Sequence, residues 1–249
     1  MVNTVSRAAL ILDYLADHDD QGVSEIAKVL EMPKSSAHSI LATMVHHQMV
    51  EKDERTGRFH LGLKLIELGY RAQGELGLVR IGRPFLQGLN RDTDETVHLT
   101  VLDHREVLYV DCVESRLRLR TYSVIGVRAP LYCTSVGKAL LAWQSGAYIE
   151  EYLSNTELKP ETSRTITDAA DLKIELEKVK SQGFAIDDRE HEDHLRCIGA
   201  PIRNSRGEVF ASLSISGPEV RMTPDRVREL APRIIDVASD ISRKSGFRN

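Results

Sequence analysis

The first fifty residues carry the same apolar stripe three times in succession. Its members recur with the i, i+3, i+4, i+7 spacing of one helix face: Ala8, Ile11, Leu12 and Leu15; then Val23, Ile26, Ala27 and Leu30; then Ala37, Ile40, Leu41 and Met44. The pattern predicts three short amphipathic helices. We expect Ser24 to cap the second helix and Pro33 to begin the third, because a first turn needs no amide donor. Only the stretch from Glu31 to Pro33 separates these two helices, which is typical of a helix-turn-helix.

Two short strands are expected directly after the third helix. Residues 49–52 and 58–61 fit strands, and residues 53–57 between them are rich in turn formers. Gly57 is free to take a positive φ in that turn. Three helices and a β-hairpin are typical of a winged helix-turn-helix, although other small α+β modules share this order of elements.

The third helix presents a small polar face opposite its apolar stripe. At about 100° per residue, the positions pointing away from the core are Ser35, Ser39, Ala42 and His46, flanked by Ser36 and His38. Short hydroxyl side chains let a helix approach the major groove closely, whereas a merely solvated face more often carries long Glu and Lys side chains. Lys34, at the helix start, and Arg58, on the wing, suit phosphate or minor-groove contacts. We predict DNA binding through Lys34, Ser35, Ser36, His38, Ser39 and Arg58.

The charge balance gives no general support for DNA binding. The chain has a formal net charge of -4, and residues 1–63 hold six Lys and Arg against nine Asp and Glu. Phosphate contacts need cations locally rather than over the whole protein. Binding by this region therefore has to depend on where its few cations are placed.

Length and composition suit a two-domain protein of the cytoplasm. The 249 residues exceed the usual size of one domain, and no low-complexity tract or repeat stands out. The first twenty residues contain neither an apolar run long enough for a membrane span nor an export signal. Cys112, Cys133 and Cys197 are odd in number and widely spaced, as expected of reduced thiols. We expect a soluble, cytoplasmic protein with no membrane partner.

Several segments of the chain match a known family. They are VSEIAKVLEMPKSSAHSILATM and GRFHLGLKLIELG in the N-terminal part, and PLYCTSVGKALLAW, GFAIDDREHEDHLRCIGAPI and ASLSISGP in the C-terminal part. Through them the chain resembles the isocitrate lyase regulator (IclR) family over nearly its whole length. The segment RTYSVIGVRAPLYCTSVGKALLAW is most similar to family members that repress pectin and uronate catabolism in response to 2-keto-3-deoxygluconate. The resemblance implies a ligand-responsive repressor of a sugar-acid or keto-acid operon, with activation as the alternative because relatives include activators.

The chain departs from the family at two positions of the DNA-binding region. The family usually places Arg where this chain has Ser39, so one contact to DNA is lost. Many members have Gly where this chain has Glu31, and the difference removes the easiest route to a left-handed backbone in the turn. Both differences bear on the operator sequence rather than on DNA binding itself.

An apolar helix is expected between the two domains. Leu65, Ile66, Leu68 and Tyr70 form an apolar face on residues 62–74. In the family a helix here packs between the subunits of a dimer, which implies a homodimer, or a dimer of dimers, on a palindromic operator. The alternative is a core helix within one domain. The expected domains are residues 1–62 for DNA binding, 63–76 for the linker and dimerisation helix, and 77–249 for effector binding.

The C-terminal region mixes strands and helices. Val97, Leu99 and Val101 alternate with polar residues and predict a hairpin that continues through residues 107–111, and residues 117–122 fit a second hairpin. Helices are expected over residues 135–143 and 168–181, with Gly183 ending the latter, and from Thr223 to the C-terminal end. Strands are expected over residues 197–203 and 209–216. An antiparallel sheet with flanking helices agrees with the GAF-like sensor fold that the resemblance implies, and the whole chain is α+β.

Two sequence features suit a small acidic ligand. Residues 134–137 begin a helix, so free amides and the Ser135 hydroxyl are available to a carboxylate. The period of two in residues 213–216 sends Leu213 and Ile215 to one face of a strand and Ser214 and Ser216 to the other, where the hydroxyls suit a polyol or keto acid.

The resemblance adds the remaining pocket residues. In relatives, the positions matching Asp187, Cys197, Ser214 and Ser216 line the effector pocket with those matching Ser135 and Val136, and Ala129 and Leu131 match apolar wall positions. Because a carboxylate repels an anionic ligand, we expect Asp187 at the hydroxyl-bearing end of the ligand, far from the helix start. The predicted effector site is Ala129, Leu131, Ser135, Val136, Asp187, Cys197, Ser214 and Ser216.

Each of these residues also has a purely structural interpretation. Ser135 could simply begin a helix, Ser214 and Ser216 could be strand surface, and Cys197 could be an ordinary buried thiol. The agreement of all of them with one family pattern favours the pocket.

An enzyme, a metal-containing sensor and a protein-binding module are the alternatives to a DNA-binding regulator. An enzyme using Cys197 with His191 or His194 and Asp187 lacks any motif that activates the thiol, so no catalytic residue is expected. Cys133, Cys197 and Asp187 offer soft and hard metal ligands, which would give a metal-containing sensor; we nevertheless expect no cofactor. A winged helix that binds only protein is the third alternative, and it would lack salt-dependent DNA binding.

Overall fold

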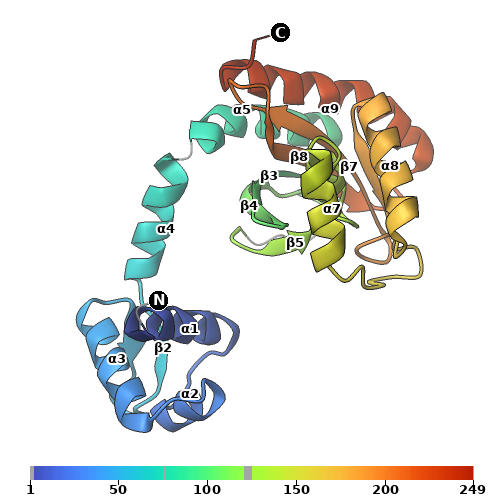
Figure 1. Ribbon diagram of the computed structural model, residues 1–249. Coiled ribbons are helices and arrows are strands. Elements are labelled where there is room, and N and C mark those ends of the chain that lie inside the picture. Colours follow the sequence, from blue (N-terminus) through green and yellow to red (C-terminus); the bar gives the residue numbers. More distant parts are fainter. Residues whose placement is uncertain (1–2, 76, 121–124, 249) are drawn as a thin grey trace. The chain divides into compact units, whose positions relative to one another are not determined.

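The structure is a computed structural model that describes residues 3–75, 77–120 and 125–248. It divides into two compact units, Met1–Glu75 and Leu76–Asn249. Figure 1 shows the elements of both units along the chain. Each unit has its own hydrophobic core, so each is described by itself.

The first unit is a winged helix-turn-helix followed by one more helix. Its elements are α1 (Asn3–Asp17), α2 (Val23–Val29), α3 (Lys34–His46), β1 (Val50–Lys52), β2 (Phe59–Leu61) and α4 (Lys64–Glu75). The two strands pair antiparallel, with Glu51 opposite His60. The three predicted apolar stripes supply most of the core, together with Val50 and Phe59 from the wing. The winged helix-turn-helix predicted from periodicity is confirmed.

Backbone geometry bears out two sequence expectations in this unit and overturns one. Glu31 has φ 48° and Gly57 has φ 69°, so both turns use the left-handed region. The predicted cap of α2 is wrong: the cap position is Gly22, and Ser24 lies inside the first turn. The Glu25 carboxylate accepts a bond from the Gly22 amide at 2.7 Å, which satisfies the helix start without a hydroxyl.

The second unit is built on a six-stranded antiparallel sheet within the described residues. Its strands are β3 (Thr96–Asp103), β4 (Glu106–Val113), β5 (Arg128–Pro130), β6 (Ala185–Asp188), β7 (Leu195–Arg203) and β8 (Val209–Pro218), in the spatial order β5-β4-β3-β8-β7-β6. Its helices are α5 (Gly77–Thr93), α6 (Ser135–Leu141), α7 (Gly146–Asn155), α8 (Ala169–Gln182) and α9 (Pro224–Lys244).

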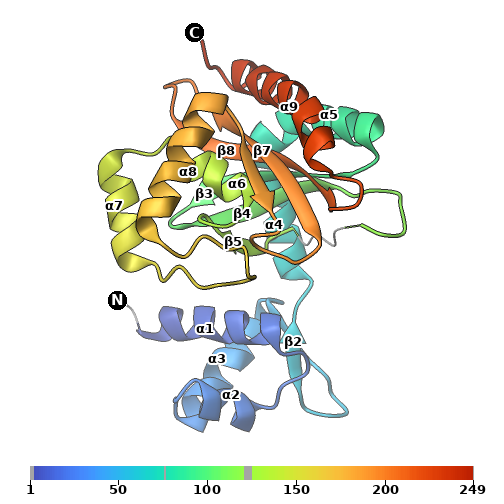
Figure 2. The same cartoon turned by 90° about the vertical axis from the view of Figure 1, so that its right-hand side faces the viewer.

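Helices cover both faces of this sheet, as Figure 2 shows. The helices α5 and α9 pack on one face, where Leu213 and Ile215 of β8 are fully buried. The other face carries α6, with α7 and α8 outside it, over a second apolar cluster. The alternation in β8 therefore turns Ser214 and Ser216 toward the α6 side, as predicted.

Several elements of this unit differ from the sequence expectations. No strand forms over residues 117–120, and the rest of the expected second hairpin, residues 121–124, lies outside the described residues. The helix α5 was not expected, because Gly82, Pro84 and Gly88 interrupt its sequence. The helix α7 and the short strands β5 and β6 were also missed, since strands of three or four residues leave too few positions for a period of two to emerge.

The remaining helix ends agree with their capping residues. Asp168 caps α8 by accepting from the amides of Ala170 and Asp171, and Gly183 ends the helix at φ 82°. Thr223 caps α9 and Pro224 begins it. Because caps act within a few residues, they are visible in the sequence.

Candidate functional site

The polar face of α3 has the exposure that groove binding requires. Lys34, Ser35, His38 and Ser39 are exposed and Ser36 is half-buried, whereas the stripe on the opposite side is buried. The hydroxyl of Ser39 donates to the Ser35 carbonyl at 3.0 Å. Such back-bonding leaves the hydroxyl oxygen as an outward acceptor. The face is therefore narrow and polar, with Lys34 at its start.

Arg58, the predicted phosphate contact of the wing, is engaged within its own domain. Its Nη2 lies 2.7 Å from Oε2 of Glu25, and its Nε donates to the Asp20 carbonyl. The bond from the Gly22 amide, together with the Arg58 charge, holds the pKa of Glu25 below its usual range. Glu25 therefore competes with any DNA phosphate for the Arg58 guanidinium. By contrast, Lys34 has no ion-pair partner within the described part of the chain.

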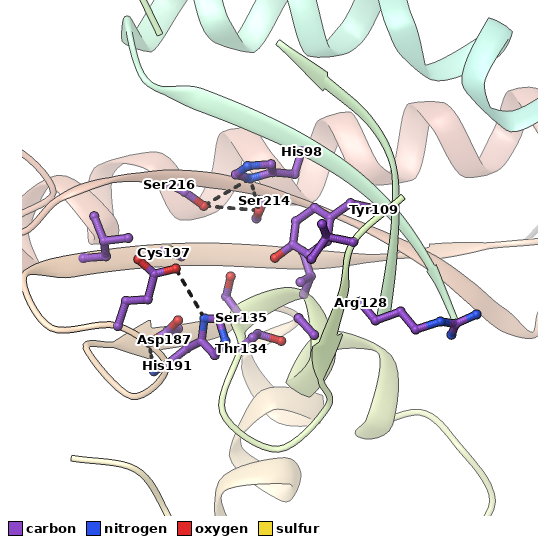
Figure 3. A pocket seen from close by; sticks show the side chains of 15 residues that line it. His98, Tyr109, Arg128, Thr134, Ser135, Asp187, His191, Cys197, Ser214 and Ser216 are labelled. Atoms are coloured by element: carbon purple, nitrogen blue, oxygen red, sulfur yellow. Dashed lines mark hydrogen bonds and ion pairs between the residues drawn. The ribbon is translucent and has the colours of Figure 1, made fainter. Parts of the chain in front are cut away.

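Polar side chains converge on a cavity of about 120 Å³ in the second unit. It lies between the sheet, the start of α6 and the loop joining β6 to β7 (Figure 3). Seven of the eight predicted effector residues line it: Ala129, Ser135, Val136, Asp187, Cys197, Ser214 and Ser216. The predicted site thus joins residues that are more than eighty positions apart in the sequence.

The eighth predicted residue, Leu131, does not line the cavity. It is fully buried in the apolar cluster beneath α6. A Cβ at Gly137 would lie 2.5 Å from the Leu131 Cα, so the helix rests directly on this backbone. The assignment of Leu131 to the pocket wall is corrected, because its side chain fills the core that supports α6.

Two glycines seat the start of α6 beside the cavity. Besides Gly137, Gly199 of β7 lies so close that a Cβ there would meet the Ser135 carbonyl at 2.8 Å. Thr134 caps the helix by accepting from the Gly137 amide at 3.0 Å and donates to the Pro130 carbonyl at 2.8 Å. The amides of Ser135 and Val136 have no acceptor within the helix, and both residues line the cavity.

The sheet forms a wall of hydroxyls around a histidine. Oγ of Ser214 lies 3.2 Å and Oγ of Ser216 lies 3.3 Å from Nδ1 of His98, on the neighbouring strand β3 (Figure 3). Burial lowers the pKa of His98 to about 4, so the ring is neutral at physiological pH. This wall carries hydrogen-bonding groups without charge.

Asp187 lies on β6, in the same row across the sheet as Cys197 of β7 and Ser216 of β8, and β6 packs against α6. Its carboxylate accepts from the Glu190 amide at 2.7 Å and from the His191 amide at 3.4 Å. Burial raises the pKa of Asp187 to about 7; the Glu190 charge adds to the rise, and the bond from the Glu190 amide and the charge of Lys138 on α6 oppose it. The expectation that Asp187 stands far from the helix start is wrong, because β6 packs against α6.

Cys133 is buried, whereas Cys112 and Cys197 are half-buried. Cys197 lines the cavity and Cys133 lies in the apolar cluster below it. Burial raises the pKa of both thiols well above the usual value. Among the described residues, no group of three or more His, Cys, Asp and Glu is placed to hold a metal ion.

The structure adds several wall residues that the sequence reasoning missed. They are His98, Tyr109, Val127, Arg128, Thr134, His191, Glu192 and Leu195. His98 was detectable in principle, because it alternates with the apolar Val97 and Leu99 and so had to face the other side of the sheet. Thr134 caps the helix start that the sequence predicts over residues 134–137. No local pattern marks the others, which reach the cavity through strand pairing and loop path.

The helix α4 exposes its apolar face. Ile66, Leu68 and Tyr70 are 69%, 40% and 76% exposed. The alternative of a core helix within one domain is therefore wrong.

None of the described helices is long and apolar enough to cross a membrane.

Nearly the whole chain matches two family models. Residues 4–54 match the IclR helix-turn-helix domain, and residues 71–243 match the bacterial transcriptional regulator IclR C-terminal domain. The HTH-type transcriptional regulator KdgR of Escherichia coli is 36% identical over 248 residues, covering 100% of this chain and 94% of that protein. The transcriptional repressor IclR of the same organism is 30% identical over 248 residues, covering 98% and 90%.

The fold matches a solved structure with a bound aromatic acid. An IclR homologue from Microbacterium hydrocarbonoxydans complexed with 4-hydroxybenzoate superposes with a TM-score of 0.86 at 26% identity, covering 98% of this chain and 99% of that chain. The arrangement of a winged helix-turn-helix and a sensor domain is thus shared with ligand-binding proteins.

Proposed function

This chain belongs to the IclR family of bacterial transcriptional regulators, and from that premise we propose that it represses an operon for the catabolism of a sugar acid or keto acid. It is a ligand-responsive, DNA-binding regulator, since both family domains are present. The similarity to KdgR supports the proposed substrate class. Its place of action is the cytoplasm.

The single observation that carries the proposal is the polarity of the cavity. One wall offers the amides of Ser135 and Val136, and the other offers the hydroxyls of Ser214 and Ser216. The first suits a carboxylate, and the second suits neutral ligand oxygens. Asp187, when protonated, donates a hydrogen bond to the carboxylate rather than repelling it. The effector is therefore a small acid that bears further oxygens.

DNA binding rests on α3 and the wing, in residues 1–62. The exposed face of α3 enters the major groove with Ser35, Ser36, His38 and Ser39, and Lys34 contacts a phosphate at its edge. Arg58 contacts a second phosphate once it leaves Glu25. The operator is double-stranded DNA.

The apolar face of α4 supports a homodimer. Exposure of apolar side chains such as Ile66 and Tyr70 to water is unfavourable, and the free energy falls when a second copy covers them. Residues 63–76 then set the separation of the two recognition helices, which requires a palindromic operator. Two dimers pairing through residues 77–249 would give a dimer of dimers.

Effector and operator act on each other through linkage. A ligand that binds one dimer geometry better than another shifts the population toward that geometry. The factor by which the ligand changes DNA affinity equals the factor by which DNA changes ligand affinity. No chemical step is needed for this response, so the protein acts without catalysis.

The test measures operator binding in the presence of acids. The upstream region of the chain's own gene is labelled, and fluorescence anisotropy is recorded with sugar acids, keto acids and aromatic acids added in turn. We expect tight binding that a sugar acid or keto acid weakens at least tenfold. Tightening of DNA binding by that acid would instead indicate an activator, and release by aromatic acids alone would refute the proposed effector class.

A further inference from the structure

His98 stands at the centre of the hydroxyl wall. The strands β3 and β8 place it directly opposite Ser214, and its Nδ1 lies within 3.3 Å of both serine hydroxyls. The two serine oxygens lie 3.4 Å from each other. Figure 3 shows the three side chains as one cluster at the cavity edge.

One ring nitrogen cannot satisfy both serines. Each hydroxyl offers one donor and two acceptor sites, whereas Nδ1 offers either one lone pair or one hydrogen. Whichever tautomer is present, serine hydrogen-bonding capacity remains after the histidine contacts are made. Because Ser214 and Ser216 line the cavity, that capacity is available to a ligand.

The next pair along the same two strands shows the opposite arrangement. Oγ1 of Thr100 lies 2.7 Å from Oγ of Ser212, and Ser212 donates to the Val136 carbonyl at 3.0 Å. Both residues are fully buried, and neither lines the cavity. Their hydroxyls are satisfied by the protein itself. Ser214 and Ser216 differ because both contact the same nitrogen of His98 and both line the cavity.

The ring is held in one orientation and carries no charge. Tyr109 packs its ring edge-to-face on His98, with centroids 5.2 Å apart and planes at 82°. Because the imidazole is buried and neutral, this wall has no cation for an ion pair with a carboxylate. It suits a neutral oxygen, such as a hydroxyl or a ketone.

We propose that His98 is a positioning residue that orients Ser214 and Ser216 and thereby makes the cavity select acids that carry a hydroxyl or keto oxygen over the same acids without it. This inference rests on the proposed effector function of the cavity. It adds the residue that sets selectivity and the ligand group that the residue recognises.

The test compares matched acids on the full-length chain. Calorimetry is performed with D-glycerate against propanoate, and with D-gluconate against hexanoate, so that each pair differs only in hydroxyl groups. We expect at least one hydroxylated acid to bind the wild type roughly tenfold or more tightly than its partner, the scale of two hydrogen bonds. His98→Phe keeps an aromatic ring of similar size and should reduce this ratio to about one.

Two further variants separate positioning from packing. His98→Gln retains a side-chain amide that can bond a serine hydroxyl, so it should keep part of the selectivity. Thr100→Val removes a buried hydroxyl bond from the same strand outside the cavity and should leave the ratio unchanged. Fluorescence of Trp143, the single tryptophan, monitors folding of this domain in every variant.

Three results would overturn the inference. They are equal binding of both members of each pair to the wild type, including absence of binding; an unchanged ratio in both His98 variants; and an equal loss in Thr100→Val. None of these touches the regulator function itself, because operator release by another acid would still be seen in the anisotropy assay.

Discussion

Nζ of Lys138 lies 2.5 Å from Oε1 of Glu190, and the lysine side chain is completely buried. The pair joins α6 to the loop between β6 and β7, and Glu175 of α8 lies 3.7 Å from the same ammonium. The Glu190 amide in turn donates to Asp187 in the cavity. One buried ion pair therefore joins α6 to the loop that holds Asp187 in the cavity wall.

Removing the lysine should destabilise the second domain strongly. Lys138→Met leaves the Glu190 carboxylate buried without its partner, and breaking a buried pair in this way costs about 3–5 kcal/mol. Urea unfolding followed by Trp143 fluorescence measures the loss. The double variant Lys138→Met, Glu190→Gln should be more stable than the lysine variant alone, because the orphaned charge is gone. A double variant less stable than Lys138→Met would contradict this account.

Asp187→Asn should change how stability depends on pH. The folded carboxyl has a pKa of about 7 against 3.8 ordinarily, so the folded state holds its proton through a range in which the unfolded state has lost it. Stability from this group is therefore fully present below about pH 4, falls as pH rises toward 7, and stays low above it. The asparagine variant lacks that loss and should gain on the order of a few kcal/mol relative to wild type between pH 4 and pH 8. Unfolding curves of both proteins across this range decide it; a constant difference would show that Asp187 is ionised throughout.

Glu25→Gln should strengthen DNA binding. The change frees Arg58 for phosphate and removes a negative charge, while glutamine can still accept from the Gly22 amide. We expect higher affinity and a slope of log affinity against log salt steeper by about one contact. Arg58→Ala in this background should abolish the gain. Glu229→Gln, which breaks the exposed Arg226 pair on α9, is the control and should leave DNA affinity as it is.

A carboxylate on the exposed face of α3 should abolish operator binding. Ser35→Glu and His38→Glu each place a negative charge where phosphate is expected, on positions that are exposed and make no core contact. Thermal unfolding should be nearly unchanged. Ser181→Glu adds the same charge to the exposed end of α8 and serves as the comparison. Gel shifts with normal affinity in either α3 variant would mean that another surface reads the DNA.

Charges on α4 should dissociate the proposed dimer. Ile66→Asp with Tyr70→Asp replaces two exposed apolar side chains, so the monomer loses nothing while a buried interface would have to desolvate two carboxylates. Light scattering should give a mass near 27.9 kDa, and operator affinity should fall. A variant that keeps the mass of the wild-type protein would place the interface elsewhere.

The sequence by itself determined the features that depend on neighbours along the chain. The three apolar stripes predict α1, α2 and α3, and the turn-forming residues 53–57 predict the positive φ of Gly57. The alternation in β8 predicts the face of the strand on which Ser214 and Ser216 lie. Caps at Asp168 and Thr223 were visible for the same reason: their bonds span two or three residues. Predicted cavity residues such as Asp187 and Cys197 came instead from the family resemblance, which carries tertiary information that periodicity lacks.

Only the tertiary structure decided which distant residues meet. His98 contacts Ser214 across 116 positions because β3 pairs with β8, and Arg58 meets Glu25 because the wing folds back along α2. The Leu131 side chain lies in the core for a similar reason, because α6 packs directly on the Leu131 backbone. Local periodicity sets the face on which a side chain lies, but the order of strands and the packing of helices set what that face meets, and these depend on burying apolar surface over the whole domain.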